Sequence, residues 1–282
     1  MPLLRRTNPG QSGKTSGLAR GFFHIMRFVD FLFHTSYSLG MERESKGLAI
    51  VIRSTKIRER DRLLTLFSPS LGIINVLSYG ARKSIRCVKA PLYTEGNFSL
   101  EKGRSGIVLK DIDVISTHDA ISEDLDKSQA AMLFSDLVLT SRSAEPELYA
   151  LFASALDALE DESFEKVTVE FIVHFLSFEG LSGDFSICPV CGRTYGEKEV
   201  LGFSSSEGVP VCHDCDTMDG ALLLPPNARA YLKRSLELSF SDSLSLVVSD
   251  EQEHRIFRYL LRTLPFSFPG KLKSLEYGIW KI

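Results

Sequence analysis

The sequence predicts an α+β protein: an N-terminal five-stranded OB-like β-barrel followed by an α-helical domain with an inserted four-cysteine knuckle. Three observations predict this class. Five short apolar runs separated by turn residues lie between residues 47 and 118. From Asp119 onward apolar residues recur at helical spacing. Four of the five cysteines form two close pairs within residues 185–220.

Length and composition exclude several classes of protein. The 282 residues allow two domains and a small third module, at roughly 100–200 residues per domain. Hydrophobic residues make up 44% and charged residues 24%, which is typical of folded globular chains and excludes global disorder. No uncharged apolar run reaches the ~20 residues that a membrane-spanning helix needs.

Residues 1–44 are expected to be a poorly ordered or mispredicted N-terminal extension. The apolar segment Gly21–Phe33 resembles a signal-peptide core, but three polar residues interrupt it and no convincing cleavage site follows. Two interpretations remain open: a genuine extension, or a natural start at Met41. Without an export signal we expect a cytoplasmic protein.

A barrel domain is predicted over residues 45–118. Turn residues separate its runs, and an SH3-like barrel is the alternative that strand counting cannot separate from an OB-like one. The five expected strands are Gly47–Thr55, Arg62–Phe67, Ile73–Tyr79, Leu92–Leu100 and Ile107–Ile115.

Helices are predicted for most of the remaining chain. The acidic region 119–184 contains three candidates, and two more in residues 221–282 are expected to complete the same bundle. Pro146 suits a first helical turn, whereas Asn227 and Asp250 suit N-caps. The expected helices are Ser128–Thr140, Glu147–Leu159, Val167–Phe178, Asn227–Leu236 and Glu251–Leu264.

The cysteine pairs in residues 185–220 predict a zinc-ribbon-like module. They are Cys188-Pro-Val-Cys191 and Cys212-His-Asp-Cys215, with 20 residues between them. Each pair can place two thiolates on one metal, and four thiolates give a closed tetrahedral Zn²⁺ site. Because no position stays open for water, we predict one structural zinc ion, with His213 exposed beside it and Cys87 uninvolved.

Charge is distributed unevenly. Residues 41–118 carry 14 basic and 8 acidic side chains, whereas residues 119–184 carry 3 basic and 15 acidic ones. A basic barrel beside an acidic helical region predicts a polyanion partner for the barrel. Tyr79, Tyr93, Phe67 and Phe98 could stack on bases; the alternative is that most of the basic residues are solvated surface charges and that Phe67 belongs to the core. The candidate nucleic-acid-binding residues are Arg82, Lys83, Arg86, Arg53, Arg58, Arg62, Lys102 and Arg104.

Enzyme motifs are absent from the sequence. It contains no G-x-x-x-x-G-K-[ST], no G-x-S-x-G and no H-E-x-x-H. We therefore predict no catalytic residues and no small-molecule substrate.

The parts together resemble the RecO family of bacterial recombination mediators. Residues 50–83, IVIRSTKIRERDRLLTLFSPSLGIINVLSYGARK, are similar to the family's opening: a strand, E-x-D-x-L-L-T-L-F, a turn with glycine, a strand, then G-A-R. The glycine at Gly180 followed by Cys188-Pro-Val-Cys191-Gly resembles the family's approach to its knuckle. The resemblance covers about residues 45–280 and excludes the first 40.

This resemblance implies a non-enzymatic DNA repair protein. Such a protein binds single- and double-stranded DNA, anneals complementary strands and, with RecR, helps load RecA onto strands coated by single-strand-binding protein. The tail of that last partner is acidic and hydrophobic, so it needs an apolar groove with basic residues. Candidates in the C-terminal helices are Arg229, Lys233, Arg234, Arg255, Arg258 and Arg262. The alternatives are a zinc-ribbon transcription or translation accessory protein and, less favoured, a nucleic-acid-processing enzyme.

Overall fold

The computed structural model describes residues 44–280 apart from residues 58–60, 81–89, 105, 142, 144, 269 and 279. The expected N-terminal extension lies outside the described residues. All described elements belong to the unit that begins at Glu42.

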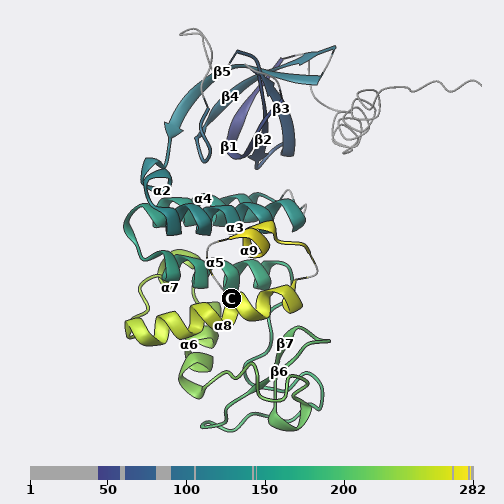
Figure 1. The fold of residues 1–282 in the computed structure, drawn as a ribbon, viewed down its shortest axis with the longest axis vertical. Coiled ribbons are helices and arrows are strands. Elements are labelled where there is room, and N and C mark those ends of the chain that lie inside the picture. Colours follow the sequence, from purple (N-terminus) through teal and green to yellow (C-terminus); the bar gives the residue numbers. More distant parts are fainter. Residues whose placement is uncertain are drawn as a thin grey trace, which may run out of the picture. The chain divides into compact units, whose positions relative to one another are not determined.

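Five strands form a closed barrel in the order β1-β2-β3-β5-β4 (Figure 1). β1 is long enough to pair antiparallel with both β2 and β4, and β3 pairs with β5 in parallel. This is the five-stranded Greek-key arrangement of an OB-fold, so the predicted barrel is confirmed. The strands are β1 (Glu44–Lys56), β2 (Arg62–Ser68), β3 (Gly72–Ser78), β4 (Glu95–Gly103) and β5 (Gly106–Ser116).

The barrel interior follows from the alternation of apolar side chains along the strands. Along β4, Phe98 and Leu100 are buried and their neighbours are partly exposed. β3 alternates in the same way through Ile74 and Val76. Gly96 is required where β4 crosses β5, because a Cβ there would lie 2.5 Å from the Asp113 carbonyl oxygen.

Eight helices are described after the barrel, and their apolar faces contribute to one continuous core. α5 is buried on most sides, as its composition predicts, and its Phe171 stacks on Phe134 of α3 at 4.1 Å between ring centroids. The helices are α2 (Asp119–Glu123), α3 (Leu125–Ser141), α4 (Pro146–Asp161), α5 (Phe164–Phe178), α6 (Pro226–Leu236), α7 (Phe240–Ser243), α8 (Asp250–Ser267) and α9 (Lys273–Tyr277).

The helix starts differ slightly from those predicted. α6 begins at Pro226, with Pro225 rather than Asn227 at the N-cap position. α8 is capped by the hydroxyl of Ser249, which accepts from the amide of Gln252, so Asp250 is the first helical residue. Short helices such as α2, α7 and α9 carry too few residues for a periodic pattern to show them.

One end of the barrel packs on the helices. Phe67 at the end of β2 lies 5.4 Å from the Tyr149 ring and 6.0 Å from the Phe152 ring, both on α4. The Tyr149 hydroxyl donates to the Glu95 carboxylate at 2.8 Å. His118 is buried after β5. Its Nδ1 atom lies 2.7 Å from the Tyr93 carbonyl oxygen, and its Nε2 atom lies 3.0 Å from the Asp157 carboxylate.

Between α5 and α6 the chain forms a small ribbon of β6 (Gly202–Ser204) and β7 (Val209–Val211). Its turn needs Gly208, whose φ is +69° and whose Cβ position lies 2.6 Å from the Phe266 carbonyl oxygen of α8. The Ser267 hydroxyl donates to the Gly208 carbonyl. The ribbon therefore packs against the end of α8. No helix within the described residues is long and apolar enough to cross a membrane.

Candidate metal centre and nucleic-acid interface

The first cysteine pair forms a tight knuckle. The Gly192 amide donates to the Cys188 carbonyl at 2.8 Å, and the Cys188 amide donates to the Arg193 carbonyl at 2.9 Å. Gly192 has φ +75°, a conformation that costs glycine little. The chain can therefore fold back directly after Cys191 and aim both thiols to the same side.

The second pair follows the ribbon directly. Cys212 comes after the last residue of β7, and His213–Cys215 form a single 3₁₀ turn. The Cys215 amide donates to the Cys212 carbonyl at 3.0 Å. β7 and this turn thus deliver the second two thiols opposite the first knuckle.

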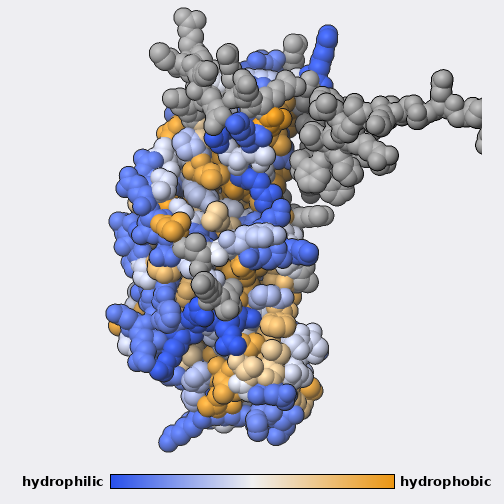
Figure 2. Space-filling view, in the orientation of Figure 1, coloured by the Kyte–Doolittle hydropathy of each residue, from blue (hydrophilic) through white to orange (hydrophobic). Residues whose placement is uncertain are grey.

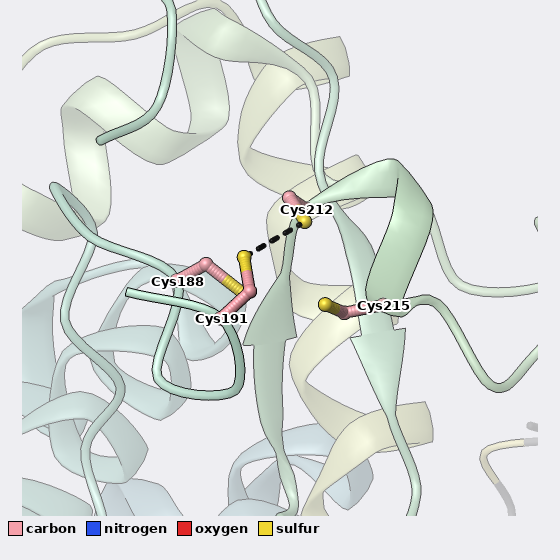
Figure 3. Close-up of side chains that lie close together, drawn as sticks. All are labelled: Cys188, Cys191, Cys212 and Cys215. Atoms are coloured by element: carbon pink, nitrogen blue, oxygen red, sulfur yellow. Dashed lines mark hydrogen bonds between the residues drawn. The ribbon is translucent and has the colours of Figure 1, made fainter. Parts of the chain in front are cut away.

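The four sulfur atoms form one cluster (Figure 3), in which all lie within 4.8 Å of one another. The Cys191 and Cys212 Sγ atoms are 3.7 Å apart. A tetrahedron with metal–sulfur bonds of ~2.3 Å has edges of about 3.8 Å, so this donor set fits Zn²⁺. Cys188 and Cys212 are buried, Cys215 is half-buried and Cys191 is exposed. His213 is exposed and is not part of the cluster, as predicted.

The pKa values of Cys188 and Cys215 shift in opposite directions. Burial alone would raise the pKa of Cys188, but hydrogen bonds from the backbone amides of Cys212, Cys191 and Val190 lower it to about 6. Hydrogen bonding to Cys212, together with burial, raises the pKa of Cys215 to about 12. A first thiolate therefore forms readily, and further ones need a compensating cation. A divalent metal supplies that charge and deprotonates coordinating thiols.

The module also places apolar side chains on the surface. Among its exposed residues are Ile187, Val190 and Val200. Figure 2 shows apolar patches in the lower part of the view, over this module, whereas hydrophilic residues dominate along the helices above it.

The basic residues of the barrel occupy two kinds of environment. Lys102 and Arg104 are exposed at the β4–β5 turn. Arg62 is half-buried and donates to the Ser54 hydroxyl at 2.8 Å, and Arg53 reaches the Asp136 carboxylate of α3 at 3.4 Å. Four of the predicted nucleic-acid-binding residues lie outside the described residues: Arg58, Arg82, Lys83 and Arg86.

Three of the four aromatic residues considered for base stacking are unsuited to it. Phe67 and Phe98 are fully buried, and Tyr93 is 6% exposed in the core between barrel and helices. Phe67 and Phe98 face inward from β2 and β4, which alternation alone left undecided. Tyr93 lies in the turn before β4, because this strand begins at Glu95 and not at the predicted Leu92. Tyr79, 48% exposed after β3, remains a candidate.

The six C-terminal basic residues predicted to bind the tail lie in three different environments. Arg255, Arg258 and Arg262 follow one face of α8 and line a groove of about 300 Å³. Lys233 donates to the Ser186 hydroxyl at 2.9 Å and Arg234 pairs with Glu237, both on the exposed side of α6. Arg229 is buried and donates to backbone carbonyls of the cysteine module, so its charge is not presented at the surface.

Sequence reasoning missed the apolar wall of this groove. It consists of Leu222, Leu223, Leu224 and Pro225, which face Ile256 on α8. The run of three leucines before two prolines is a visible signal, but no helical or strand period indicates its orientation.

Two comparisons with known proteins match this architecture. A family model described as Recombination protein O N terminal matches residues 41–118, and one described as Recombination protein O C terminal matches residues 122–276. A DNA repair protein RecO from Clostridium novyi is 24% identical over 238 residues, covering 82% of this chain and 92% of its own. A DNA repair protein RecO from Desulforamulus reducens is 26% identical and covers 81% and 91%. One from Desulfitobacterium hafniense is 33% identical and covers 60% and 63%. With both halves matched in order, the chain belongs to the RecO family of DNA repair and recombination proteins.

Proposed function

We propose that this non-enzymatic RecO protein binds single- and double-stranded DNA through its barrel and anneals complementary strands. With RecR it would help load RecA onto strands coated by single-strand-binding protein. The observation that carries the DNA part is the strand register, which brings the end of β1, the start of β2, the end of β3 and the β4–β5 turn together at the end of the barrel opposite Phe67.

The register defines a cationic rim, made of the β1–β2 loop, the chain leaving β3 and the β4–β5 turn. At the start of β2, Arg62 pairs with Ser78 at the end of β3. Next to it on β3, Leu77 pairs with Val108 near the start of β5. The neighbouring residue of β5, Ile107, pairs with Lys102 of β4. The Gly80 amide donates to the Asp61 carboxylate at 3.1 Å, which ties the loop before β2 to the chain after β3. In sequence, Arg82, Lys83 and Arg86 follow directly.

This rim has the location and chemistry of an oligonucleotide site. OB-folds bind oligonucleotides with the β1–β2 and β4–β5 loops. Lys56, Lys102 and Arg104 are exposed on these segments. Phosphate contacts of this kind give affinity without reading sequence, as a protein that anneals arbitrary strands requires.

Charge reversal tests the rim. The double variant Lys102→Glu, Arg104→Glu should weaken binding to a single-stranded oligonucleotide and reduce the slope of log affinity against log salt by about 1.4, at about 0.7 per lost phosphate contact. Arg82→Glu with Lys83→Glu should act in the same direction.

The matched control is Lys233→Glu with Arg234→Glu, which makes the same charge change on α6. An unchanged salt slope in both rim variants, or an equal loss in the control, would move the DNA site elsewhere. Annealing of complementary oligonucleotides, measured by fluorescence quenching, should fall in parallel with rim binding. Retained annealing would separate the two activities.

The groove beside α8 is the proposed site for the tail of single-strand-binding protein. Arg255, Arg258 and Arg262 recur at i, i+3 and i+7, so they form one stripe along the groove. Leu223, which is 49% exposed, and the exposed Pro225 supply the accessible apolar part of the lining. An acidic peptide with apolar side chains suits both walls, because its carboxylates can pair with the stripe while its apolar groups leave water.

Peptide binding tests this assignment. Arg258→Ala with Arg262→Ala should raise the Kd for a tail peptide by about tenfold or more, since two charge-assisted contacts are lost. Fluorescence anisotropy of a labelled peptide measures it, and Lys233→Ala with Arg234→Ala is the control. Wild-type affinity in the groove variant would contradict the site.

We further propose one structural Zn²⁺ held by Cys188, Cys191, Cys212 and Cys215. The support is the geometry of the four sulfur atoms and the lack of a fifth donor in the cluster among the residues that the structure describes. A closed four-thiolate set suits a structural ion, whereas a catalytic ion keeps a position for water.

A further inference from the structure

The groove beside α8 is built from two different parts of the fold. One wall is α8 itself, within the helical core. The other, residues 222–228, begins seven positions after Cys215 and belongs to the chain that leaves the cysteine module. This wall is therefore tied to whatever orders the four cysteines.

The tie begins in the backbone. The amides of Leu201 and Leu224 each donate to the other's carbonyl, at 3.0 and 2.9 Å, so the wall pairs with the residue that precedes β6. Between Cys215 and the wall, the Asp216 carboxylate accepts from the amides of Phe203 at 3.1 Å and Gly220 at 2.8 Å. These bonds connect the second cysteine pair to the ribbon and the ribbon to the groove.

Arg229 supplies a second connection, from the first turn of α6. Its Nη2 atom donates to the carbonyls of Gly196 at 2.7 Å and Glu197 at 2.8 Å. Its guanidinium lies 5.8 Å from the centre of the Tyr195 ring, whose hydroxyl donates to the Pro210 carbonyl at 3.1 Å. One buried side chain thus holds the loop after the first knuckle and, through Tyr195, reaches β7.

The same helix turn lines the groove. Asn227 and Ala228, immediately before Arg229, are groove residues, and Leu222–Pro225 lead directly into them. If the loop at Gly196 and Glu197 shifts, Arg229 shifts with it. The groove residues Asn227 and Ala228 directly precede Arg229 in the chain, so they would shift as well.

We propose that Arg229 is a positioning residue through which the four-cysteine module shapes the groove, so that metal and groove ligand stabilise each other. This rests on the proposed occupant of the groove. A metal that links the two cysteine pairs holds both the loop and the ribbon in place. Since coupling between two sites is reciprocal, a groove ligand must then raise the affinity for the metal by the same factor by which the metal raises the affinity for the ligand.

The test uses the zinc-loaded full chain and the variant Arg229→Lys. Lysine keeps the charge but lacks the planar fork that reaches two carbonyls while lying over a ring. We expect an unchanged far-UV spectrum and DNA affinity, a Kd for the tail peptide raised about tenfold, and more zinc transferred at equilibrium to a fixed concentration of a colorimetric chelator. Arg234→Lys is the control, because Arg234 is exposed on the same helix but, contrary to the prediction for the tail site, does not line the groove; this variant should match wild type in every measurement.

Two further measurements, the effect of bound peptide on zinc transfer and amide hydrogen exchange, test the coupling directly. In wild type, bound peptide should reduce the zinc transferred to the chelator at equilibrium, and in Arg229→Lys it should reduce it much less. Amide hydrogen exchange at Leu201 and Leu224 should accelerate in the variant and after chelation, with or without peptide. If the variant does not fold, Tyr195→Leu, which removes the ring beneath the guanidinium, takes its place.

Folded Arg229→Lys with wild-type exchange, zinc transfer and peptide affinity would overturn the coupling. If the peptide does not bind wild type at all while exchange at Leu224 still responds to chelation, the coupling stands and the proposed occupant is wrong. Binding of the peptide with no response of Leu224 to either change leaves the occupant and rejects the coupling.

Discussion

At the scale of single residues, the proposed metal site depends on each of its four cysteines, and Cys188 is a buried one. Cys188→Ser should remove the bound zinc, about one ion per chain, and lower the melting temperature, because metal binding in such modules is coupled to folding. Metal analysis and thermal unfolding measure both effects. Cys87→Ser, at the cysteine outside the pairs, is the matched control and should change neither. If a variant lacking all four paired cysteines is as stable as wild type, the structural role is wrong.

A second residue-scale feature is the buried polar group inside the helical core. Glu170 of α5 is fully buried and accepts hydrogen bonds from the hydroxyls of Tyr231 at 2.5 Å and Ser235, both on α6. His174, one turn later, has its Nε2 atom 3.8 Å from the Glu170 carboxylate. Such networks fix the relative position of two helices, because an unpaired hydroxyl in the core is costly.

His174 predicts a pH dependence of stability. Burial lowers its pKa below the usual 6.5, despite the opposing charge of Glu170. The unfolded chain therefore takes up a proton at a higher pH than the folded one, so the free energy of unfolding falls as pH drops below about 6.5 and levels off below the folded-state pKa. Urea unfolding from pH 7.5 to 5 should show this decline, with a shallower slope in His174→Gln. An equal slope in the variant would assign the effect to other groups.

At the scale of elements, the contact between β2 and α4 holds the barrel to the helices. Phe67→Ala should destabilise the protein by about 3–5 kcal/mol, because it removes a fully buried ring that contacts two aromatic residues. Phe67→Leu should cost less, since it leaves a smaller cavity. Urea unfolding measures both, and Tyr79→Ala, at a half-exposed aromatic residue, is the control. A cost below about 1 kcal/mol for the alanine variant would contradict the contact's importance.

At the scale of the whole molecule, the proposed DNA and tail sites use separate elements. The cationic rim belongs to the barrel, whereas the groove is lined by residues 222–228 and α8. The acidic region 119–184, with its 15 carboxylates, repels phosphates and favours approach of DNA to the barrel. The two ligands should therefore bind together.

Simultaneous binding can be measured directly. A saturating oligonucleotide should leave the Kd of the tail peptide unchanged within about a factor of two, because ligands without a shared surface or a shared two-state element do not couple. Anisotropy of labelled peptide, with and without oligonucleotide, is the measurement. Competition between the two would place them on one surface.

The sequence by itself determined the α+β class, the five barrel strands, the main helices and the identity of the four clustered cysteines. These depend on local signals: alternation along β3 and β4, helical periodicity in α4 and α8, and the fixed spacing within each Cys-x₂-Cys pair. The resemblance carried by Glu59–Phe67 and Gly80-Ala81-Arg82 indicated the family that the comparisons then showed.

Only the tertiary structure decided which side chains face inward and which distant segments meet. Alternation does not say which face of a strand is buried, so Phe67 and Phe98 were candidates for stacking until their burial was known. Arg229 and Arg262 are alike in sequence, yet one is buried against backbone carbonyls and the other lines a groove. The cationic rim depends on the pairing of β3 with β5, and the groove on the contact between the Leu222–Pro225 segment and α8. Both join residues tens of positions apart, and such contacts form only when the chain closes its core.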